Sequence, residues 1–270
     1  VAGVPEGDGG HLFRRTGQGS FEEVTDRVNL DAVAGNGAAV GDYDNDGNVD
    51  LYITGGEGEN VLCRNGGETG FADETQAAGV EVAGSGLSRS SASFVDIDND
   101  GDLDLFAGNV AGRDFLFRNN GDGSFTEMAV QAGVSEPRRT IYHMFGDIDN
   151  DGWMDLFVGN NLGYNSGFSD VRDTEFERLS DALYRNNGDG TFTNIVQQAG
   201  INHLVRPEEV LFWDYNNDGW LDIFLASVPP SNRLYRNNGD RSFTEVGEAA
   251  GVRSRGFSSS VTAGDYDNDG

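Results

Sequence analysis

An acidic stretch that recurs five times is the feature that most constrains how this chain can fold. The copies read GDYDNDGNVDLY from Gly41, VDIDNDGDLDLF from Val95, GDIDNDGWMDLF from Gly146, WDYNNDGWLDIF from Trp213 and GDYDNDG from Gly264. Their first Asp residues follow one another at intervals of 51 to 67 residues along the chain. Self-similarity at such a period is typical of repeat proteins, in which each copy is one supersecondary unit.

A second signature alternates with the acidic stretch. It reads LFRR, LCRN, LFRN, LYRN and LYRN and begins at Leu12, Leu62, Leu116, Leu183 and Leu234. A Phe follows each of its Arg residues by seven positions, and we expect this Phe in the core. The longest interval between acidic stretches contains about sixteen extra residues within 160–181. Because the repeat tolerates this insertion, we expect it in a surface loop, where it is the best candidate for a dedicated recognition surface.

Each complete unit reads as four short strands. Small or apolar runs precede the acidic stretch, and aliphatic or aromatic runs such as LYIT and LFVG follow it. Asn-Gly and Asp-Gly pairs between such runs indicate hairpins. Four strands in about 50 residues are typical of a β-propeller blade. The sequence therefore predicts an all-β chain that forms part of one β-propeller over 1–270, with units at 1–29, 30–80, 81–134, 135–201, 202–252 and 253–270.

The first and last units are incomplete, and we expect both chain ends to cut through a repeat. Segments such as ETQAAGV and EMAVQAGV would add single helical turns between units.

The charge of the chain favours cations as partners. It holds 46 Asp and Glu against 18 Lys and Arg, for a formal net charge of −28. Such a charge disfavours nucleic acid and anionic membrane surfaces. No apolar run approaches the roughly 18 residues that a membrane span needs.

Carboxylates and carboxamides fall at fixed positions of each acidic stretch, numbered from its first Asp. Positions 1, 3, 5 and 9 carry the candidate side-chain ligands, position 6 is always Gly, and position 7 would offer a backbone carbonyl. The candidate metal ligands are Asp42, Asp44, Asp46, Asn48 and Asp50; Asp96, Asp98, Asp100, Asp102 and Asp104; Asp147, Asp149, Asp151, Trp153 and Asp155; Asp214, Asn216, Asp218, Trp220 and Asp222; and Asp265, Asp267 and Asp269.

So many like charges within nine residues predict a bound cation. Hard oxygen ligands in this number suit Ca²⁺ better than Zn²⁺, which prefers nitrogen and sulfur, or Mg²⁺, which retains waters. An EF-hand begins with the same pattern but needs a Glu at position 12, where this chain has Ile53, Ala107, Val158 and Leu225. The alternative, a set of solvated Asp-rich turns, does not require the same pattern five times.

The motif D-x-D-x-D-G-x-x-D-[LI], with LYRNNGDGTF between copies, resembles the FG-GAP (VCBS-type) repeats of integrin-like β-propellers. This resemblance implies one Ca²⁺ in the hairpin between the first and second strands of each blade, hence four complete sites and one truncated site. The fourth loop departs from the pattern at Asn216, which removes a charge. We expect the last copy, which lacks a position 9, to hold its ion poorly.

Other residues have a structural and a functional interpretation. The Arg residues of the second signature could form a ring for an anionic ligand, but pairing with nearby acids is favoured. Trp153, Trp213 and Trp220 could stack on sugars, although packing between blades is favoured. His143, on or near an inner strand that faces the central channel, is the least improbable catalytic residue, and a packed structural role is favoured for it.

The sequence thus predicts a calcium-binding, non-catalytic module for adhesion, recognition or structural assembly, with an extracellular protein or glycan as partner. It is expected at the cell surface, in the periplasm or in the secreted fraction, because cytosolic calcium would not fill micromolar-range sites. The alternative is a lectin or a carbohydrate-active enzyme similar to polysaccharide lyases, with its site at the propeller centre.

Overall fold

The computed structural model describes residues 11–265 apart from residue 18, residues 31–32, 34, 36, 56–59, 83–90, 111, 139, 161–180, 202–206, 228–231 and 255. The insertion at 160–181 therefore lies almost entirely outside the described residues. No helix in the described part of the chain has the length and apolar character needed to span a bilayer.

Four antiparallel sheets of four strands each dominate the fold. The first contains β3 (Gly37–Gly41), β4 (Asp50–Thr54), β5 (Val61–Asn65) and β6 (Phe71–Asp73). The second contains β7 (Ala92–Val95), β8 (Asp104–Ala107), β10 (Phe115–Asn119) and β11 (Phe125–Glu127). The third contains β13 (Thr140–Gly146), β14 (Asp155–Asn160), β15 (Ala182–Asn186) and β16 (Phe192–Asn194). The fourth contains β17 (Pro207–Trp213), β18 (Asp222–Ser227), β19 (Arg233–Asn237) and β20 (Phe243–Glu245). The predicted all-β class and the four strands per complete unit are confirmed.

The acidic stretch of each unit closes the hairpin between the first and second strands of its sheet. The residue before the first Asp pairs with the Asp at position 9, as Gly41 does with Asp50 and Gly146 with Asp155. Each loop is therefore held at both ends by ladder hydrogen bonds.

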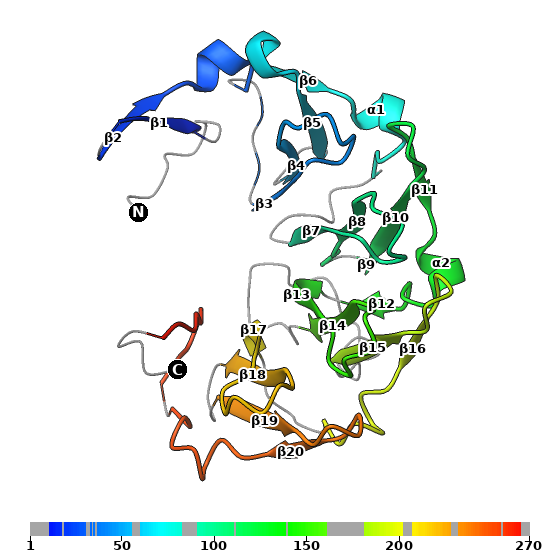
Figure 1. Ribbon diagram of the computed structural model, residues 1–270, viewed down its shortest axis with the longest axis vertical. Helices are drawn as coiled ribbons and strands as arrows, with labels where there is room; N and C mark the ends of the chain where they lie inside the picture. Colours follow the sequence, from blue (N-terminus) through cyan, green and yellow to red (C-terminus); the bar gives the residue numbers. More distant parts are fainter. Residues whose placement is uncertain are drawn as a thin grey trace, which may run out of the picture.

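The four sheets follow one another around an arc (Figure 1). The first strand of each sheet, β3, β7, β13 or β17, lies toward the inside of the arc, and the last, β6, β11, β16 or β20, lies at its outside. Neighbouring first strands approach closely: a Cβ on Gly146 of β13 would lie 2.6 Å from Cδ2 of Phe212 in β17. A larger residue at position 146 would therefore push the third and fourth sheets apart.

Three hydrophobic clusters fill the spaces between neighbouring sheets. One joins the first and second sheets, one the second and third, and one the third and fourth. In the last of these, Phe157 of β14 meets Phe212 of β17 edge to face, with ring centroids 6.5 Å apart. Burial of one such side chain stabilises the fold by about 1.5–3 kcal/mol. The sheets are therefore held to one another mainly by apolar packing.

Smaller elements complete the described chain. A hairpin of β1 (Phe13–Gly17) and β2 (Ser20–Glu23) precedes the first sheet, and β9 (Gly112–Arg113) pairs with β12 (Pro137–Arg138). The helical turns are η1 (Thr25–Val28), η2 (Gly67–Thr69), α1 (Thr75–Ala78) and α2 (Ala129–Ala132). The single helical turns expected after β6 and β11 are thus confirmed.

The expectation that a Phe of the repeat enters the core holds in the later sheets and is wrong in the first hairpin. Phe125, Phe192 and Phe243 are buried, Phe71 of β6 is half-buried, and Phe21 of β2 is 66% exposed. The buried residues belong to four-stranded sheets that pack against a neighbour, and Phe21 belongs to a hairpin of two strands.

Candidate metal sites

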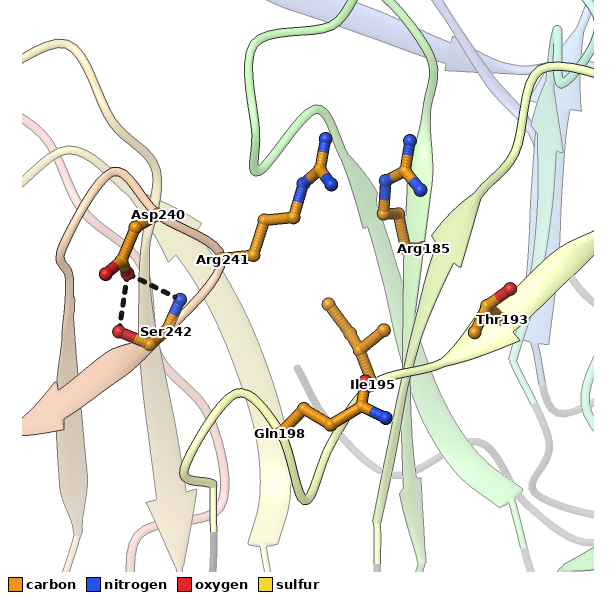
Figure 2. A pocket seen from close by; sticks show the side chains of 7 residues that line it. All are labelled: Arg185, Thr193, Ile195, Gln198, Asp240, Arg241 and Ser242. Atoms are coloured by element: carbon orange, nitrogen blue, oxygen red, sulfur yellow. Dashed lines mark hydrogen bonds between the residues drawn. The ribbon is translucent and has the colours of Figure 1, made fainter.

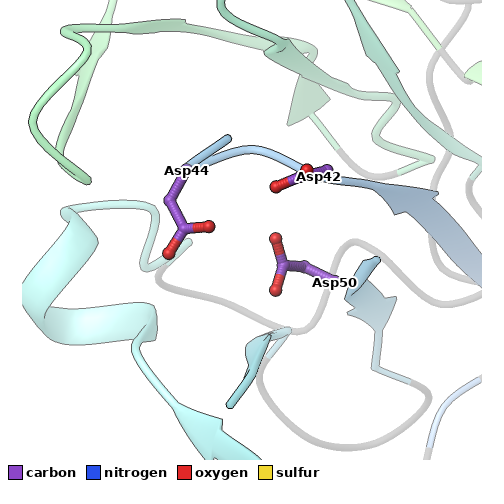
Figure 3. A group of neighbouring side chains, drawn as sticks. All are labelled: Asp42, Asp44 and Asp50. Carbon is purple, nitrogen blue, oxygen red and sulfur yellow. The ribbon is translucent and has the colours of Figure 1, made fainter. Parts of the chain in front are cut away.

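Three acidic loops bring carboxylates from positions 1, 3 and 9 together. In each, one oxygen of every side chain lies within 4.8 Å of the others. Figure 3 shows how the three side chains of the first loop point toward one another. The clusters are Asp42, Asp44 and Asp50; Asp96, Asp98 and Asp104; and Asp147, Asp149 and Asp155.

The backbone of each loop wraps around the carboxylate at position 1. In the third loop, Asp147 accepts hydrogen bonds from the backbone N–H groups of Asp151 (3.1 Å) and Gly152 (2.9 Å). The Gly at position 6 has φ between 87° and 92° in the four described loops, a region that a Cβ disfavours. The predicted need for Gly at this position is confirmed.

The Asp at position 9 begins the second strand and ties the loop to the third strand. In the second loop, Asp104 is 1% exposed. Its two oxygens accept from the backbone N–H groups of Ile97 (2.9 Å) and Asn119 (2.8 Å). The same pair of contacts recurs at Asp50, Asp155 and Asp222.

Several carboxylate oxygens of these clusters are buried without a hydrogen-bond partner. They are Oδ1 of Asp96, Oδ1 of Asp98 and Oδ1 of Asp149. A buried ionised oxygen that lacks a donor carries a full desolvation penalty. Positions 1, 3 and 9 therefore fit a hard cation, which would supply the missing positive partner.

Burial also makes ionisation of the clustered carboxyls unfavourable. It raises the pKa of Asp104 and of Asp155 to about 7, and the other carboxylates of each loop add to this effect. The pKa of Asp98 is raised by burial and by the charges of Asp100 and Asp96. A bound metal ion would lower these pKa values again, because its positive charge favours the ionised carboxylates.

Comparison with known proteins agrees with this repeat pattern. A model of the FG-GAP-like repeat matches residues 42–107, 96–158 and 214–270, which together make up more than half of the chain. The chain belongs to the FG-GAP-like repeat family. The resemblance expected from the motifs is therefore confirmed.

Two curated proteins are similar in sequence to this chain. Cartilage acidic protein 1 from Homo sapiens is 30% identical over 179 residues, which are 62% of this chain and 24% of that protein. Cartilage acidic protein 1 from Mus musculus is 27% identical over 214 residues, which are 75% of this chain and 29% of that protein. The chain spans about a quarter of the length of these curated relatives.

Position 5 of the FG-GAP-like loops does not join the clusters, although the sequence made it a candidate ligand. Its carboxylate accepts the backbone N–H of position 7, as Asp100 does from Asp102 at 2.9 Å and Asp151 from Trp153 at 3.1 Å. Position 5 thus shapes the turn in this structure. The structure gives no contact for the position 7 carbonyl, so that ligand stays a prediction.

The last two loops differ from the first three. In the fourth, the Nδ2 of Asn216 donates to Asp218 at 2.8 Å, while Asp214 and Asp222 keep their usual backbone donors. In the fifth, Asp265 is exposed, and Asp267 and Asp269 lie outside the described residues.

Arg residues of the second signature pair with their own acidic loops in two FG-GAP-like units. Arg64 contacts Asp44 and Asp46, and Arg185 contacts Asp149 (3.0 Å) and Asp151 (3.3 Å). Among the described residues, the side chain of neither Arg118 nor Arg236 makes a hydrogen bond or an ion pair, although the loop of the Arg118 unit keeps Asp98 at position 3. Arg14 of the first hairpin contacts Glu22, so the favoured interpretation, pairing with nearby acids, applies to Arg14, Arg64 and Arg185.

The Asn after this Arg is a structural residue that the sequence analysis missed. Asn186 is fully buried, and its Nδ2 donates to Ile97 O of the preceding loop at 2.8 Å and to Met154 O of its own loop at 3.2 Å. Asn119 and Asn237 make the equivalent contacts. Its recurrence in four of five copies was the available signal.

A second missed residue is the Asn at position 4, which has φ between 54° and 56°. It reaches the next acidic loop along the chain. Asn45 donates to Asp102 Oδ1 at 2.7 Å, Asn99 to Gly152 O at 2.9 Å, and Asn150 to Gly219 O at 2.9 Å. Successive acidic loops are thus hydrogen-bonded to one another.

Of the remaining candidates, His143 and Trp153 pack against other residues, whereas Trp213 is exposed. His143 of β13 is 9% exposed, and its ring nitrogens contact Ser91 Oγ (2.7 Å) and Ser93 Oγ (2.8 Å). Trp153 lies over the turn of its own sheet, 2.8 Å from where a Cβ on Gly188 would stand. Trp213 is 44% exposed.

Proposed function

We propose that this chain is a calcium-binding β-propeller module that acts outside the cytoplasm, without catalysis, in adhesion, recognition or structural assembly. Its partner would be an extracellular protein or a glycan. The observation that carries the proposal is the set of buried, unpaired carboxylate oxygens at Asp96, Asp98 and Asp149. Family membership and the arc of four-stranded sheets support it.

Calcium is favoured because the donor set contains oxygen alone. Positions 1, 3 and 9 would hold the ion in the first three loops, and the carbonyl at position 7 would complete its coordination. The ion would offset the mutual repulsion of carboxylates that lie within 4.8 Å of one another. In the fourth loop, Asn216 supplies an uncharged oxygen, so a weaker site is proposed there.

The extracellular setting follows from the supply of the ion. Where free calcium exceeds the dissociation constant about 100-fold, each site adds on the order of 2.7 kcal/mol to the free energy of unfolding. Extracellular calcium meets this condition for micromolar-range sites, and cytosolic calcium does not.

Recognition is favoured over catalysis by the state of His143. Its two ring nitrogens are engaged with Ser91 and Ser93, and burial lowers its pKa to about 3. A general base must keep a free nitrogen within reach of substrate. No described observation favours the alternative, an enzyme with its site at the propeller centre.

Thermal unfolding with and without calcium tests the proposal. The melting temperature should rise sharply from EDTA to millimolar Ca²⁺, and Mg²⁺ at the same concentration should give a smaller rise. Isothermal titration should detect at least three sites, matching the three clusters. A melting temperature that EDTA does not change, or equal rises with Mg²⁺ and Ca²⁺, would refute the calcium assignment.

A further inference from the structure

A pocket between the third and fourth sheets contains two guanidinium groups. Its volume is about 300 Å³, and it is lined by Arg185, Thr193, Ile195, Gln198, Asp240, Arg241 and Ser242. Figure 2 shows both guanidinium groups side by side at one end of the pocket, with Ile195 and Gln198 below them. Both guanidinium groups also contact carboxylates of the third acidic loop, and Asp240 lines the same pocket, so its charge is mixed.

Arg241 occupies a backbone conformation that disfavours it. Its φ is 70°, and the matching positions of the second and third sheets carry Gly123 (φ 85°) and Gly190 (φ 82°). A side chain in this region strains the backbone, and such strain persists where the side chain has a task. The fourth sheet thus keeps an Arg where the fold itself favours Gly.

Both Arg residues contact one carboxylate of the third acidic loop. Arg185 Nε lies 3.0 Å and Arg241 Nε 2.7 Å from Asp149 Oδ2, and the Asp149 side chain is 4% exposed. Arg185 also reaches Asp151 at 3.3 Å. The terminal nitrogens of Arg241 have no hydrogen-bond partner among the described residues, and its side chain is 52% exposed. These terminal nitrogens can therefore take a second anionic group.

We propose that this pocket binds the carboxylate of an acidic sugar, a uronic acid residue, on Arg241 and Arg185. The two terminal nitrogens of Arg241 match the planar fork of a carboxylate, and Arg185 adds the terminal nitrogen that its contacts with Asp149 and Asp151 leave open. Gln198 and the Asp240 oxygen that does not accept from Ser242 would supply acceptors for ring hydroxyls, and Ile195 an apolar contact for the face of the ring. The volume of about 300 Å³ suits a single sugar residue.

The hydrogen-bond acceptors of the pocket favour a sugar over an acidic peptide as its ligand. A Glu or Asp residue of a peptide offers only backbone N–H groups as further donors, whereas a sugar ring carries several hydroxyl donors next to its carboxylate. A uronic acid uses the Arg residues and the acceptors together.

Calcium should strengthen the binding of the sugar. Asp149 belongs to the third cluster, and its Oδ1 is buried without a hydrogen-bond partner. A cation bound to Oδ1 would withdraw negative charge from Oδ2. The carboxylate would then neutralise the two guanidinium groups less, so they would attract an anionic ligand more strongly. The effect of calcium on sugar binding rests on the proposed calcium site. The pocket itself and its binding of a carboxylate do not.

The test measures binding of methyl glucuronide to the whole chain by ligand-observed NMR or calorimetry, in millimolar Ca²⁺ and in EDTA. Methyl glucoside is the neutral control, and a blocked glutamate is the peptide control. Arg241→Gly restores the residue found at Gly123 and Gly190, so the variant should fold. Arg236→Gln is the matched control, because Arg236 lies on β19 outside the pocket.

Methyl glucuronide should bind the unaltered chain and the Arg236→Gln variant, with at least about tenfold loss in Arg241→Gly. Binding should weaken in EDTA. The inference is overturned if methyl glucuronide does not bind, or if methyl glucoside or blocked glutamate binds with the same affinity. It is also overturned if the Arg241→Gly variant binds methyl glucuronide with unchanged affinity. A calcium-dependent melting temperature alongside any of these results would leave the proposed function intact. Equal sugar binding in EDTA and in Ca²⁺ would overturn only the dependence on calcium.

Discussion

Each acidic loop places carboxylates where they repel one another, so a single substitution should destabilise the fold only when calcium is present. Asp98 is a suitable probe, because its Oδ1 is buried without a partner and burial raises its pKa. In EDTA, Asp98→Asn should leave the melting temperature unchanged or raise it. In millimolar Ca²⁺ it should remove one site's contribution, about 2.7 kcal/mol at 100-fold saturation. Paired thermal melts measure both effects.

Two further variants serve as controls for this prediction. Asp122→Asn removes an exposed carboxylate from a turn of the same sheet and should leave the calcium-induced shift intact. Asn216→Asp adds the missing carboxylate to the fourth loop and should enlarge that shift. If Asp98→Asn keeps the full shift, position 3 is not a ligand.

His143 should make the protein less stable in mild acid. Burial lowers the pKa of His143 to about 3, below the roughly 6.5 of an unfolded chain. The folded state then binds fewer protons than the unfolded state between these values. The contribution of His143 to stability is therefore present above pH 6.5 and is lost as the pH falls toward 3, by up to about 1.4 kcal/mol per unit.

The His143→Gln variant isolates this contribution. It keeps polar atoms for Ser91 and Ser93 and cannot gain a charge. The difference in free energy of unfolding between the unaltered chain and the variant, from urea titrations at several pH values, should change across pH 6.5 to 4.5. A difference that stays constant with pH would show that His143 binds its proton equally well in the folded and the unfolded chain.

Sequence reasoning found the residues whose chemistry is visible in the motif and missed those whose role depends on a neighbouring sheet. Positions 1, 3 and 9 and the Gly at position 6 follow from charge and backbone geometry within one loop. The role of Asn186 depends on Ile97, which lies 89 residues earlier in the chain. Spacing within one repeat carries no information about such a contact.

At the scale of elements, neighbouring sheets are joined by two polar contacts as well as by apolar packing. The Asn after the Arg on β10, β15 or β19 reaches back to the preceding acidic loop. The Asn at position 4 reaches forward to the next loop. The contacts between neighbouring sheets therefore lie at the level of the carboxylate clusters.

Loss of the Asn186 side chain, which makes one of these backward contacts, should lower the free energy of unfolding more than loss of a neighbouring exposed Asn side chain. Asn186→Ala deletes donors to Ile97 O and Met154 O and an acceptor for the Gly188 N–H. Because these groups are buried or part-buried, the loss should be about 2–4 kcal/mol in the free energy of unfolding. Asn187→Ala, which changes an exposed residue of the same turn, should cost less than about 1 kcal/mol. Equal losses in denaturant titrations would mean that the contact between sheets adds nothing.

The strands and hairpins themselves were predictable, because each unit carries its own apolar runs and turn residues. The short pairing of β9 with β12 was not, since neither segment has a strand pattern and each exists only beside the other. The exposure of Phe21 was missed for a related reason. A motif predicts burial only when the elements that cover its side chain are present.

At the scale of the whole molecule, the repeats concentrate negative charge in loops that follow one another around the arc (Figure 1). The hydrogen bonds from Asn45, Asn99 and Asn150 to the following loops hold these loops close. Repulsion must therefore act between loops as well as within them. A net charge of −28 opposes the compact state wherever cations do not offset it.

Monovalent salt should consequently substitute for calcium in part. The Debye length falls from about 30 Å at 0.01 M salt to about 3 Å at 1 M, so salt screens repulsion between loops more completely than repulsion within a buried cluster. In EDTA, the melting temperature should rise by several degrees from low salt to about 0.5 M KCl, and the further rise on adding Ca²⁺ should shrink without vanishing. The rise in melting temperature that Ca²⁺ still causes at high salt measures direct coordination at positions 1, 3 and 9. If salt alone restored the full melting temperature, screening and not coordination would explain the acidic loops. If salt had no effect in EDTA, repulsion between loops would be absent.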